Sequence, residues 1–271
     1  MANGAADIAV RAGEPALITG ASSGIGEALA REFARRGHPL ALVARDEARL
    51  AAVADALWAA YGVEAVCIAK DLSRPESAEE IRDELLARGF QVHTLVNNAG
   101  VGWRDAFADA PLEHAAGSIR VNVEALTRLT ALLLPGMLER GSGRVLNLGS
   151  IAGFQPAATM AVYHATKAYV VSFSAALREE LRGSGVSVTC LCPGPVNTPF
   201  FERGGLPDVR ARDRRMMWSA EDIAAYGYRA ARDGRGVVIP GLLPKLMTFG
   251  RHFLPLSLQA RIGGAFYKPK G

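Results

Sequence analysis

The stretch LITGASSGIGEALA, residues 17–30, places a glycine-rich turn between a short apolar run and a segment with helical spacing. Its glycines are Gly20, Gly24 and Gly26. Because glycine has no Cβ, the backbone can approach a pyrophosphate closely, and the following helix offers amide donors and a partial positive charge. The spacing G-x-x-x-G-x-G differs from the commonest dinucleotide fingerprint, G-x-G-x-x-G. Its position in the first strand–helix unit nevertheless predicts nucleotide binding.

Short apolar runs and longer segments with helical spacing alternate along the rest of the chain. We expect strands at residues 15–20, 39–45, 63–71, 92–100, 144–150, 186–194 and 236–241. Segment 46–62 has Asp46 as a candidate N-cap and Gly62 as a stop, and segment 111–140 is also helical. Apolar strands separated by helices indicate a parallel sheet covered on both faces. The sequence therefore predicts an α/β fold, a Rossmann-type doubly wound parallel sheet of about seven strands with helices on both faces.

A single domain is expected over residues 14–241, including a substrate loop at 195–218, after a flexible N-terminal extension at 1–13. The C-terminal extension, 242–271, mixes apolar and basic residues and is broken by Pro255, which predicts two short amphipathic helices. For these helices we favour a substrate lid or an oligomer contact over a membrane-surface patch, because the apolar stretches are short.

Composition and charge argue against several classes of protein. The 271 residues are 49% hydrophobic and 21% charged, as in globular proteins. The net charge of +4 is dispersed, so nucleic-acid binding is not expected. Neither a signal peptide nor a run of about 18 uninterrupted apolar residues is present, which favours a cytoplasmic protein. The cysteines, Cys67, Cys190 and Cys192, lack the partners of a metal site and are expected to be buried free thiols.

The end of the second predicted strand bears on the choice of cofactor. NAD sites usually place a carboxylate near the ribose, whereas an arginine there suits the 2′-phosphate of NADP. Arg45 occupies this point, and Asp46 follows as the helix cap. The alternative is that Arg45 points to solvent while Asp46 binds the ribose. The sequence favours NADP(H) over NAD(H).

Tyr163 and Lys167 lie four residues apart in the segment AVYHATKAYV, residues 161–170. Four helical steps turn about 400°, so both side chains share one face. A lysine ammonium beside the phenol should lower the pKa of Tyr163. Taken alone, such a pair more often just lines a groove. His164 is turned about 100° away, which favours a structural role.

Together these motifs resemble the classical short-chain dehydrogenases/reductases. The resemblance covers roughly residues 14–240 and rests on short motifs in a fixed order: T-G-x-x-x-G-x-G at 19–26, DL at 71–72, NNAG at 97–100, VNV at 121–123, Ser150, Y-x-x-x-K at 163–167 and PG at 193–194. One departure is His93, where family members often carry an aspartate. It predicts a looser local hydrogen bond away from the chemistry.

The resemblance implies an Asn-Ser-Tyr-Lys tetrad of Asn122, Ser150, Tyr163 and Lys167, and no metal. It assigns to the cofactor phosphates Gly20, Ser22, Gly24, Ile25 and Gly26. It assigns Asp71 to the adenine, and Asn98 and Gly100 to the adenosine ribose and the wall of the site. Pro193, Gly194, Val196 and Thr198 would flank the nicotinamide. The remaining cofactor contacts are Arg45, Ser23, Leu72, Ala99, Tyr163 and Lys167.

These roles agree with what reduction of a ketone requires. Negative charge develops on the carbonyl oxygen, so the site needs a proton donor and a second hydrogen bond. Tyr163 can donate the proton, Ser150 can hold the oxygen, and Lys167 can bind the ribose. Asn122 is expected to hold a water that reloads the proton. The expected function is an NADP(H)-dependent oxidoreductase that interconverts a carbonyl, a ketone or aldehyde, and an alcohol.

Two other functions remain open at this point. One is a catalytically silent nucleotide-sensing protein, which would be expected to lose a member of the tetrad. The other is an isomerase or dehydratase, whose relatives typically have longer substrate domains. A hydrophobic small-molecule substrate is suggested by apolar residues in the loops, although packing explains them equally well: Trp103, Phe154, Met160, Phe200, Phe201 and Trp218. Family members are commonly homodimers or homotetramers.

Overall fold

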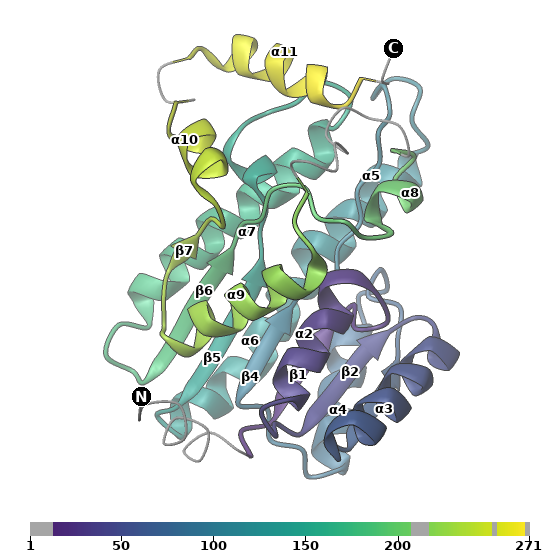
Figure 1. Cartoon of the computed structure of the whole chain (residues 1–271), viewed down its shortest axis with the longest axis vertical. Coiled ribbons are helices and arrows are strands. Elements are labelled where there is room, and N and C mark those ends of the chain that lie inside the picture. The colour runs from purple at the N-terminus through teal and green to yellow at the C-terminus, as the bar shows by residue number, and fades with distance from the viewer. Residues whose placement is uncertain (1–12, 207–216, 251–253, 269–271) are drawn as a thin grey trace.

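The computed structural model describes residues 13–206, 217–250 and 254–268 (Figure 1). The predicted N-terminal extension up to residue 12, and residues 207–216 of the substrate loop, lie outside these ranges. A seven-stranded sheet has the order β3-β2-β1-β4-β5-β6-β7, and every pairing is parallel. The strands are β1 Ala16–Thr19, β2 Leu40–Ala44, β3 Ala65–Ala69, β4 Thr94–Asn97, β5 Gly143–Leu148, β6 Val186–Leu191 and β7 Val237–Val238. The predicted doubly wound α/β fold is confirmed.

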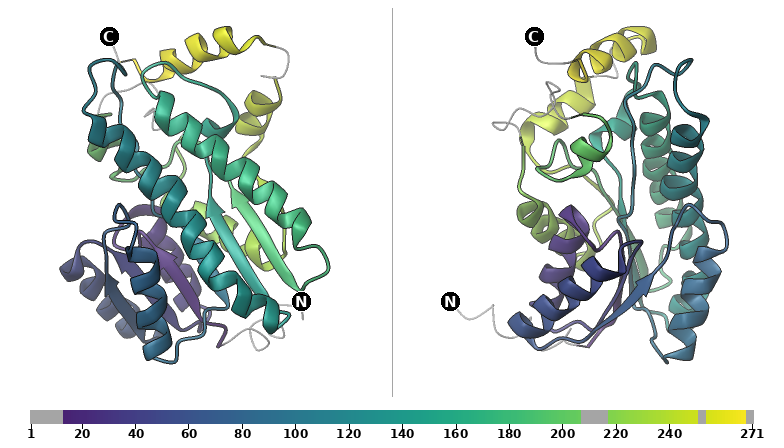
Figure 2. Two further views of the ribbon diagram at one scale, coloured as in Figure 1. Left: turned by 180° about the vertical axis from the view of Figure 1, so that it is seen from behind. Right: turned by 90° about the vertical axis from the view of Figure 1, so that its right-hand side faces the viewer.

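Helices cover both faces of this sheet (Figure 2). On one face lie α2 (Gly24–Ala34), α3 (Glu47–Tyr61) and α9 (Ala220–Arg232). On the other lie α4 (Ser77–Ala87), α6 (Leu126–Glu139) and α7 (Ala161–Glu180). Successive strand residues alternate between the two cores, so Ile18 packs on the first face and Leu17 on the second. Because both faces are covered, apolar residues can occupy consecutive strand positions, as they do throughout β2 and β3.

The helix boundaries follow local signals. Asp46 caps α3, because its carboxylate accepts a hydrogen bond from Arg49 N at 3.0 Å. The same helix ends at Gly62, which has a φ of 66° in the left-handed region that glycine tolerates. Both predictions are confirmed. The predicted strand 236–241 is shorter, since only Val237–Val238 pairs with β6 and Pro240 carries no N–H to continue the ladder.

The predicted helical segment 111–140 contains an irregular turn. It consists of α5 (Leu112–Ile119), a π-helical turn η1 (Arg120–Ala125) and α6. By length and composition the combined helix Leu112–Glu139 is long and apolar enough to cross a membrane, a test that core helices also pass. Here it packs against α4, α7 and the sheet, and it carries Asn122.

His93 immediately precedes β4, at the end of the sheet away from the strands' carboxyl ends. Its Nε2 lies 3.1 Å from Ser142 Oγ and 3.6 Å from a carboxylate oxygen of Glu14. Its backbone N–H donates to Pro15 O at 2.9 Å. His93 therefore has both side-chain and backbone partners, and the looser hydrogen bond expected at this position stays a prediction.

The C-terminal extension forms two short helices, as predicted. They are α10 (Leu242–Gly250) and α11 (Leu256–Phe266), which begins immediately after Pro255. Figure 1 shows both at one end of the molecule, above the carboxyl ends of the strands. In doubly wound folds ligands bind at that end.

Candidate active site

A large cavity of about 1150 Å³ lies at the carboxyl ends of the strands. It is lined by the segments that follow β1 to β6, together with the C-terminal helices. The predicted catalytic and cofactor residues that line it are Gly20, Ser22, Ser23, Gly24, Ile25, Arg45, Asp71, Leu72, Asn98, Ala99, Gly100, Ser150, Tyr163, Lys167, Pro193, Gly194, Val196 and Thr198. Two predicted residues, Gly26 and Asn122, lie behind its wall.

The glycine-rich turn is shaped to lie close to a nucleotide. Gly20 and Gly24 have φ values of 66° and 60°, in the left-handed region. A Cβ on Gly26 would lie 2.2 Å from the carbonyl oxygen of Gly20, so Gly26 lets α2 close onto the turn. This contact is the reason that Gly26 does not face the cavity. The helix α2 begins within this turn, and a helix N-terminus offers amide donors to a pyrophosphate.

Asn98 and Thr19 fix this turn against the end of β4. Asn98 Nδ2 donates to Thr19 O at 2.8 Å. Thr19 Oγ1 accepts from the backbone N–H groups of Asn98 and Ala99, each at 3.0 Å. The NNAG motif therefore holds the glycine-rich turn in shape as well as lining the cavity.

The far end of the cavity carries the groups predicted to select the cofactor. Arg45 is exposed on its rim, and among the described residues no hydrogen bond or ion pair engages its guanidinium. Asp46 is occupied, since it caps α3 and its other oxygen lies 3.3 Å from Arg49 Nε. One oxygen of Asp71 accepts from Ser73 N at 2.9 Å, which leaves the second oxygen for an adenine amine.

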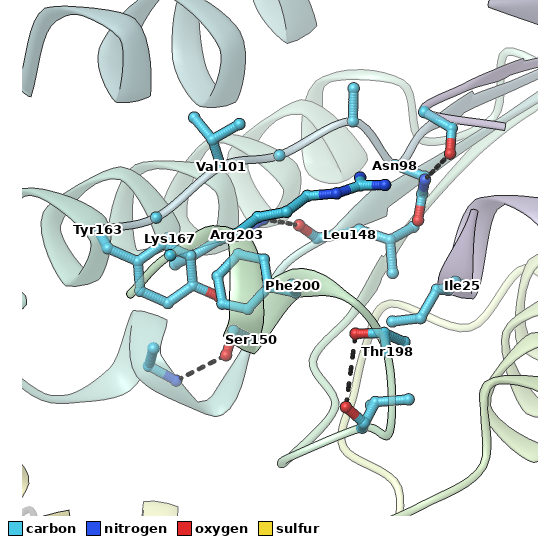
Figure 3. A pocket seen from close by; sticks show the side chains of 18 of the residues that line it. Ile25, Asn98, Val101, Leu148, Ser150, Tyr163, Lys167, Thr198, Phe200 and Arg203 are labelled. Atoms are coloured by element: carbon cyan, nitrogen blue, oxygen red, sulfur yellow. Dashed lines mark hydrogen bonds between the residues drawn. The ribbon is translucent and has the colours of Figure 1, made fainter. Parts of the chain in front are cut away.

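Ser150, Tyr163 and Lys167 meet at the opposite end of the cavity (Figure 3). Ser150 follows β5 and caps a 3₁₀ turn, η2 (Ile151–Phe154), by accepting from Ala152 N at 3.1 Å. Tyr163 and Lys167 lie on α7, as their spacing predicted. Lys167 Nζ donates to Leu148 O at 2.6 Å and lies 6.0 Å from the centre of the Tyr163 ring.

The pKa values of this cluster differ from those the sequence predicts. Burial raises the pKa of Tyr163 to about 12. The hydrogen bond between Tyr163 and Ser150 lowers this pKa, but its effect is smaller than that of burial. Burial also lowers the pKa of Lys167, to about 8. The predicted lowering of the Tyr163 pKa by Lys167 is therefore wrong, because desolvation is the larger effect and the ammonium is directed at Leu148 O.

Asn122 braces the site from the π-helical turn η1. Its Oδ1 accepts from Val101 N at 2.9 Å, and its Nδ2 donates to Val101 O at 2.8 Å and to Thr166 Oγ1 at 3.0 Å. A Cβ on Gly100 would lie 3.4 Å from Asn122 Oδ1 and 3.5 Å from Lys167 Nζ, so both groups reach the back of Gly100. The water predicted here stays a prediction, and it would bind the remaining Oδ1 lone pair or the backbone carbonyl.

Apolar side chains surround Tyr163 on the substrate side. Phe200, from α8 (Phe200–Arg203), lies 5.4 Å from the Tyr163 ring, centre to centre. A Cβ on Gly102 would come within 2.6 Å of that ring, so the loop after β4 lies flat against it. The predicted apolar loop residues that line the cavity are Trp103, Met160, Phe200, Phe201 and Trp218. Phe154, the last residue of η2, does not, because it packs in a separate cluster with Val170, Cys190 and Cys192.

The C-terminal helix α11 supplies a wall that motif comparison could not reveal. Gly263, Phe266 and Tyr267 line the cavity. Tyr267 OH lies 3.0 Å from Nε2 of His164, whose Nδ1 bonds to the backbone of Gln155, so the structural role predicted for His164 is confirmed. The only sequence signals were the glycine pair 263–264 and the aromatic residues after it.

Arg203 is a second residue that the sequence did not single out. Its Nη1 donates to Ser23 Oγ at 3.2 Å, and Figure 3 shows its side chain extending across the cavity. A guanidinium beside the glycine-rich turn can neutralise a bound diphosphate. Arg203→Met should therefore weaken NADPH binding about tenfold, as measured by fluorescence titration. An unchanged dissociation constant would show that Arg203 contacts only Ser23.

The three cysteines are free thiols. As predicted, Cys190 and Cys192 are buried free thiols. Cys190 lies on β6 and Cys192 directly after it, and their sulfurs are 3.6 Å apart. Cys67 is only half-buried, so its prediction is wrong in part, since β3 is an edge strand. No group of three metal-binding side chains occurs within residues 13–206, 217–250 and 254–268.

Comparison of the sequence with known protein families identifies the family of this chain. The sequence profile described as "short chain dehydrogenase" matches residues 14–205, which carry the glycine-rich turn and the whole tetrad. The chain belongs to the short-chain dehydrogenase family. Membership of this family agrees with the Rossmann-type parallel sheet described above.

Among relatives of this short-chain dehydrogenase is the very-long-chain 3-oxoacyl-CoA reductase of Anas platyrhynchos, 38% identical over 189 residues. That match covers 68% of this chain and 60% of the relative, so the chain spans about 60% of that protein's length. A short-chain dehydrogenase from Sphingobium yanoikuyae in complex with NADPH is 34% identical with a TM-score of 0.80, over 88% of this chain and 92% of that one. One from Burkholderia phymatum in complex with NAD is 28% identical with a TM-score of 0.81, over 96% and 98%.

Proposed function

We propose that this short-chain dehydrogenase uses NADP(H) to interconvert a hydrophobic ketone or aldehyde and the corresponding alcohol. The observation that carries the proposal is the meeting of Ser150, Tyr163 and Lys167 in one cavity with the glycine-rich turn. The similarity to a 3-oxoacyl-CoA reductase and the apolar lining around Tyr163 support a hydrophobic carbonyl.

Bound NADP(H) would supply the hydride. Ser150 Oγ would donate a hydrogen bond to the carbonyl oxygen, on which negative charge develops, and Tyr163 would give that oxygen its proton. The raised pKa of Tyr163 suits this role, because the phenol stays protonated at neutral pH. Lys167 would hold the ribose hydroxyls and stabilise the phenolate that remains after the transfer.

The preference for NADP(H) rests on the contrast between Arg45 and Asp46. Arg45 is available for a 2′-phosphate, whereas the Asp46 carboxylate is engaged by the backbone and side chain of Arg49. Arginine binds phosphate through charge-assisted, often bidentate, hydrogen bonds. The relatives bound to NADPH and to NAD show that the family accommodates both cofactors, so this residue pair carries the proposal.

Arg45→Asp should lower kcat/KM for NADPH by about 10–100-fold, because one or two charge-assisted hydrogen bonds are lost and a repulsion is gained. The value for NADH should rise or stay level, since a carboxylate suits a free 2′-hydroxyl. Arg49→Asp is the matched control on the same rim. If NADPH and NADH lose activity equally in Arg45→Asp, the 2′-phosphate does not bind there.

The general test is to assay apolar ketones, aldehydes and secondary alcohols with NADPH and NADP⁺. Turnover supports the proposal. Tight cofactor binding without turnover of any tested compound would favour a nucleotide sensor instead. We also propose a cytoplasmic location and a homodimer or homotetramer, which fractionation and light scattering respectively test.

A further inference from the structure

The helix α11 differs from a usual amphipathic helix, because it exposes large apolar side chains to the surroundings. Its buried residues are Gln259, Gly263 and Gly264, and a Cβ on Gly263 would lie 2.6 Å from Pro156 O. Gln259 Nε2 donates to Leu254 O at 2.8 Å. The large side chains Leu258 and Ile262, one turn apart, face outward. Apart from Phe266 at its end, which packs toward the cavity, α11 therefore contacts the protein mainly through small and polar residues and exposes branched apolar residues to the surroundings.

The preceding helix, α10, also directs apolar side chains outward. Leu242, Leu246 and Phe249 have the i, i+4, i+7 spacing of one helical face, and all three are exposed. With their neighbours they form a surface that we call the tail face. Its members are between 38% and 74% exposed: Leu242, Leu243, Leu246, Phe249, Leu254, Leu256, Leu258 and Ile262. Figures 1 and 2 show both helices at the same end of the molecule.

Charge distinguishes between the surfaces that such a face can meet. Residues 242–271 contain no Asp or Glu, and their basic residues are Lys245, Arg251, Arg261, Lys268 and Lys270. Lys245 and Arg261 are exposed within the two helices themselves. A second copy related by a two-fold axis would bring like charges together. An anionic lipid surface would match both the apolar side chains and the cations.

The tail face also continues into the cavity. Leu242, Leu243 and Pro244 line it, on the same helix that exposes Leu246 to the outside. A protein seated on this helix would cover the cavity's rim, whereas a bilayer would deliver apolar molecules to it. The short apolar stretches made a membrane contact the less favoured prediction from the sequence. The exposed apolar side chains of α10 and α11 now favour a membrane contact over a lid or an oligomer contact.

We propose that the tail face docks on the surface of anionic lipid bilayers, from which the cavity takes lipophilic carbonyl substrates. The identity of the substrate rests on the function proposed above, but the docking does not. The helices would lie in the plane of the interface with their apolar side chains among the headgroups and upper acyl chains. Neither helix is long enough to span a bilayer.

The test is flotation of the full-length protein with phosphatidylcholine vesicles, with and without about one third phosphatidylglycerol. We expect binding to the anionic vesicles, weakened by added salt because part of the attraction is electrostatic. Leu246→Glu combined with Ile262→Glu should reduce the bound-to-free ratio about tenfold or more, since apolar burial drives insertion. Neither residue lines the cavity.

Leu86→Glu is the matched control, because Leu86 is 69% exposed at the end of α4, away from the C-terminal helices. It should leave vesicle binding unchanged. Tyr163→Phe should also bind vesicles as the wild type does, which separates the docking from turnover. Absence of wild-type binding to anionic vesicles overturns the proposal. So does a wild-type dimer that the paired glutamates convert to a monomer, because a second copy would then cover the face.

Discussion

Tyr163→Phe should lower kcat by about 10²–10⁴-fold, the usual contribution of a positioned proton donor. The dissociation constant for NADPH should stay within about twofold, because the substitution removes one hydroxyl and keeps the ring. That ring packs on Phe200 and against Gly102, so the cavity wall is preserved. Steady-state kinetics and fluorescence titration of NADPH measure the two effects.

Tyr169→Phe is the matched control for this substitution. Tyr169 lies on the same helix, α7, and its hydroxyl bonds to Thr127 at 2.9 Å outside the cavity. Its loss should leave kcat unchanged within about twofold, since an exposed hydrogen bond of this kind affects stability only slightly. Near wild-type turnover in Tyr163→Phe would remove Tyr163 from the chemistry and assign the proton to another group.

Much of the fold could be predicted because local signals and tertiary demands agree in this chain. The strands carry consecutive apolar residues since both sheet faces are covered, and Asp46 and Gly62 bound α3 with their usual chemistry. At Pro240 the apolar pattern and the hydrogen bonding of the sheet disagree. The pattern predicts a strand over 236–241, but proline has no N–H to donate, and the strand is only Val237–Val238. The π-helical turn at Asn122 was not predictable, since the side chain bonds to Val101 in a distant loop.

The site was predictable to the extent that its residues lie in short motifs. A motif gives residue types at a spacing, but it does not give the direction in which each residue faces. The sequence therefore did not predict that Gly26 and Asn122 lie behind the cavity wall. Arg203 and Tyr267 were missed because their partners, Ser23 and His164, are far away in sequence. The pKa of Tyr163 was wrong in direction, since burial depends on all the surrounding elements.

The affinity for NADPH should fall as the pH rises through about 8. Burial lowers the pKa of Lys167 to about 8 in the cofactor-free protein, and only its ammonium form carries the charge predicted to hold the ribose. The affinity should be constant below about pH 7 and decline above about pH 8, following the proton on Lys167. Fluorescence titration of NADPH between about pH 6.5 and 9.5 measures the change.

Stability should respond to this group in the opposite direction. The folded pKa of Lys167 lies below its ordinary value of 10.5, so between about pH 8 and 10 the unfolded chain binds more protons than the folded one. Its contribution to the free energy of unfolding therefore increases as the pH rises through that window. A loss of NADPH affinity above pH 8 without a lower melting temperature would then reflect the site and not unfolding.

Lys167→Met isolates the ammonium from the rest of the cavity. Methionine keeps an unbranched chain in this buried position, so the variant should bind NADPH about tenfold more weakly and show no step near pH 8. Tyr163→Phe retains Lys167 and should keep the step, which excludes the phenol as its source. A step that persists in Lys167→Met would assign the titration to another group. A wild-type affinity that is flat to about pH 9.5 would mean that Lys167 keeps its proton despite burial.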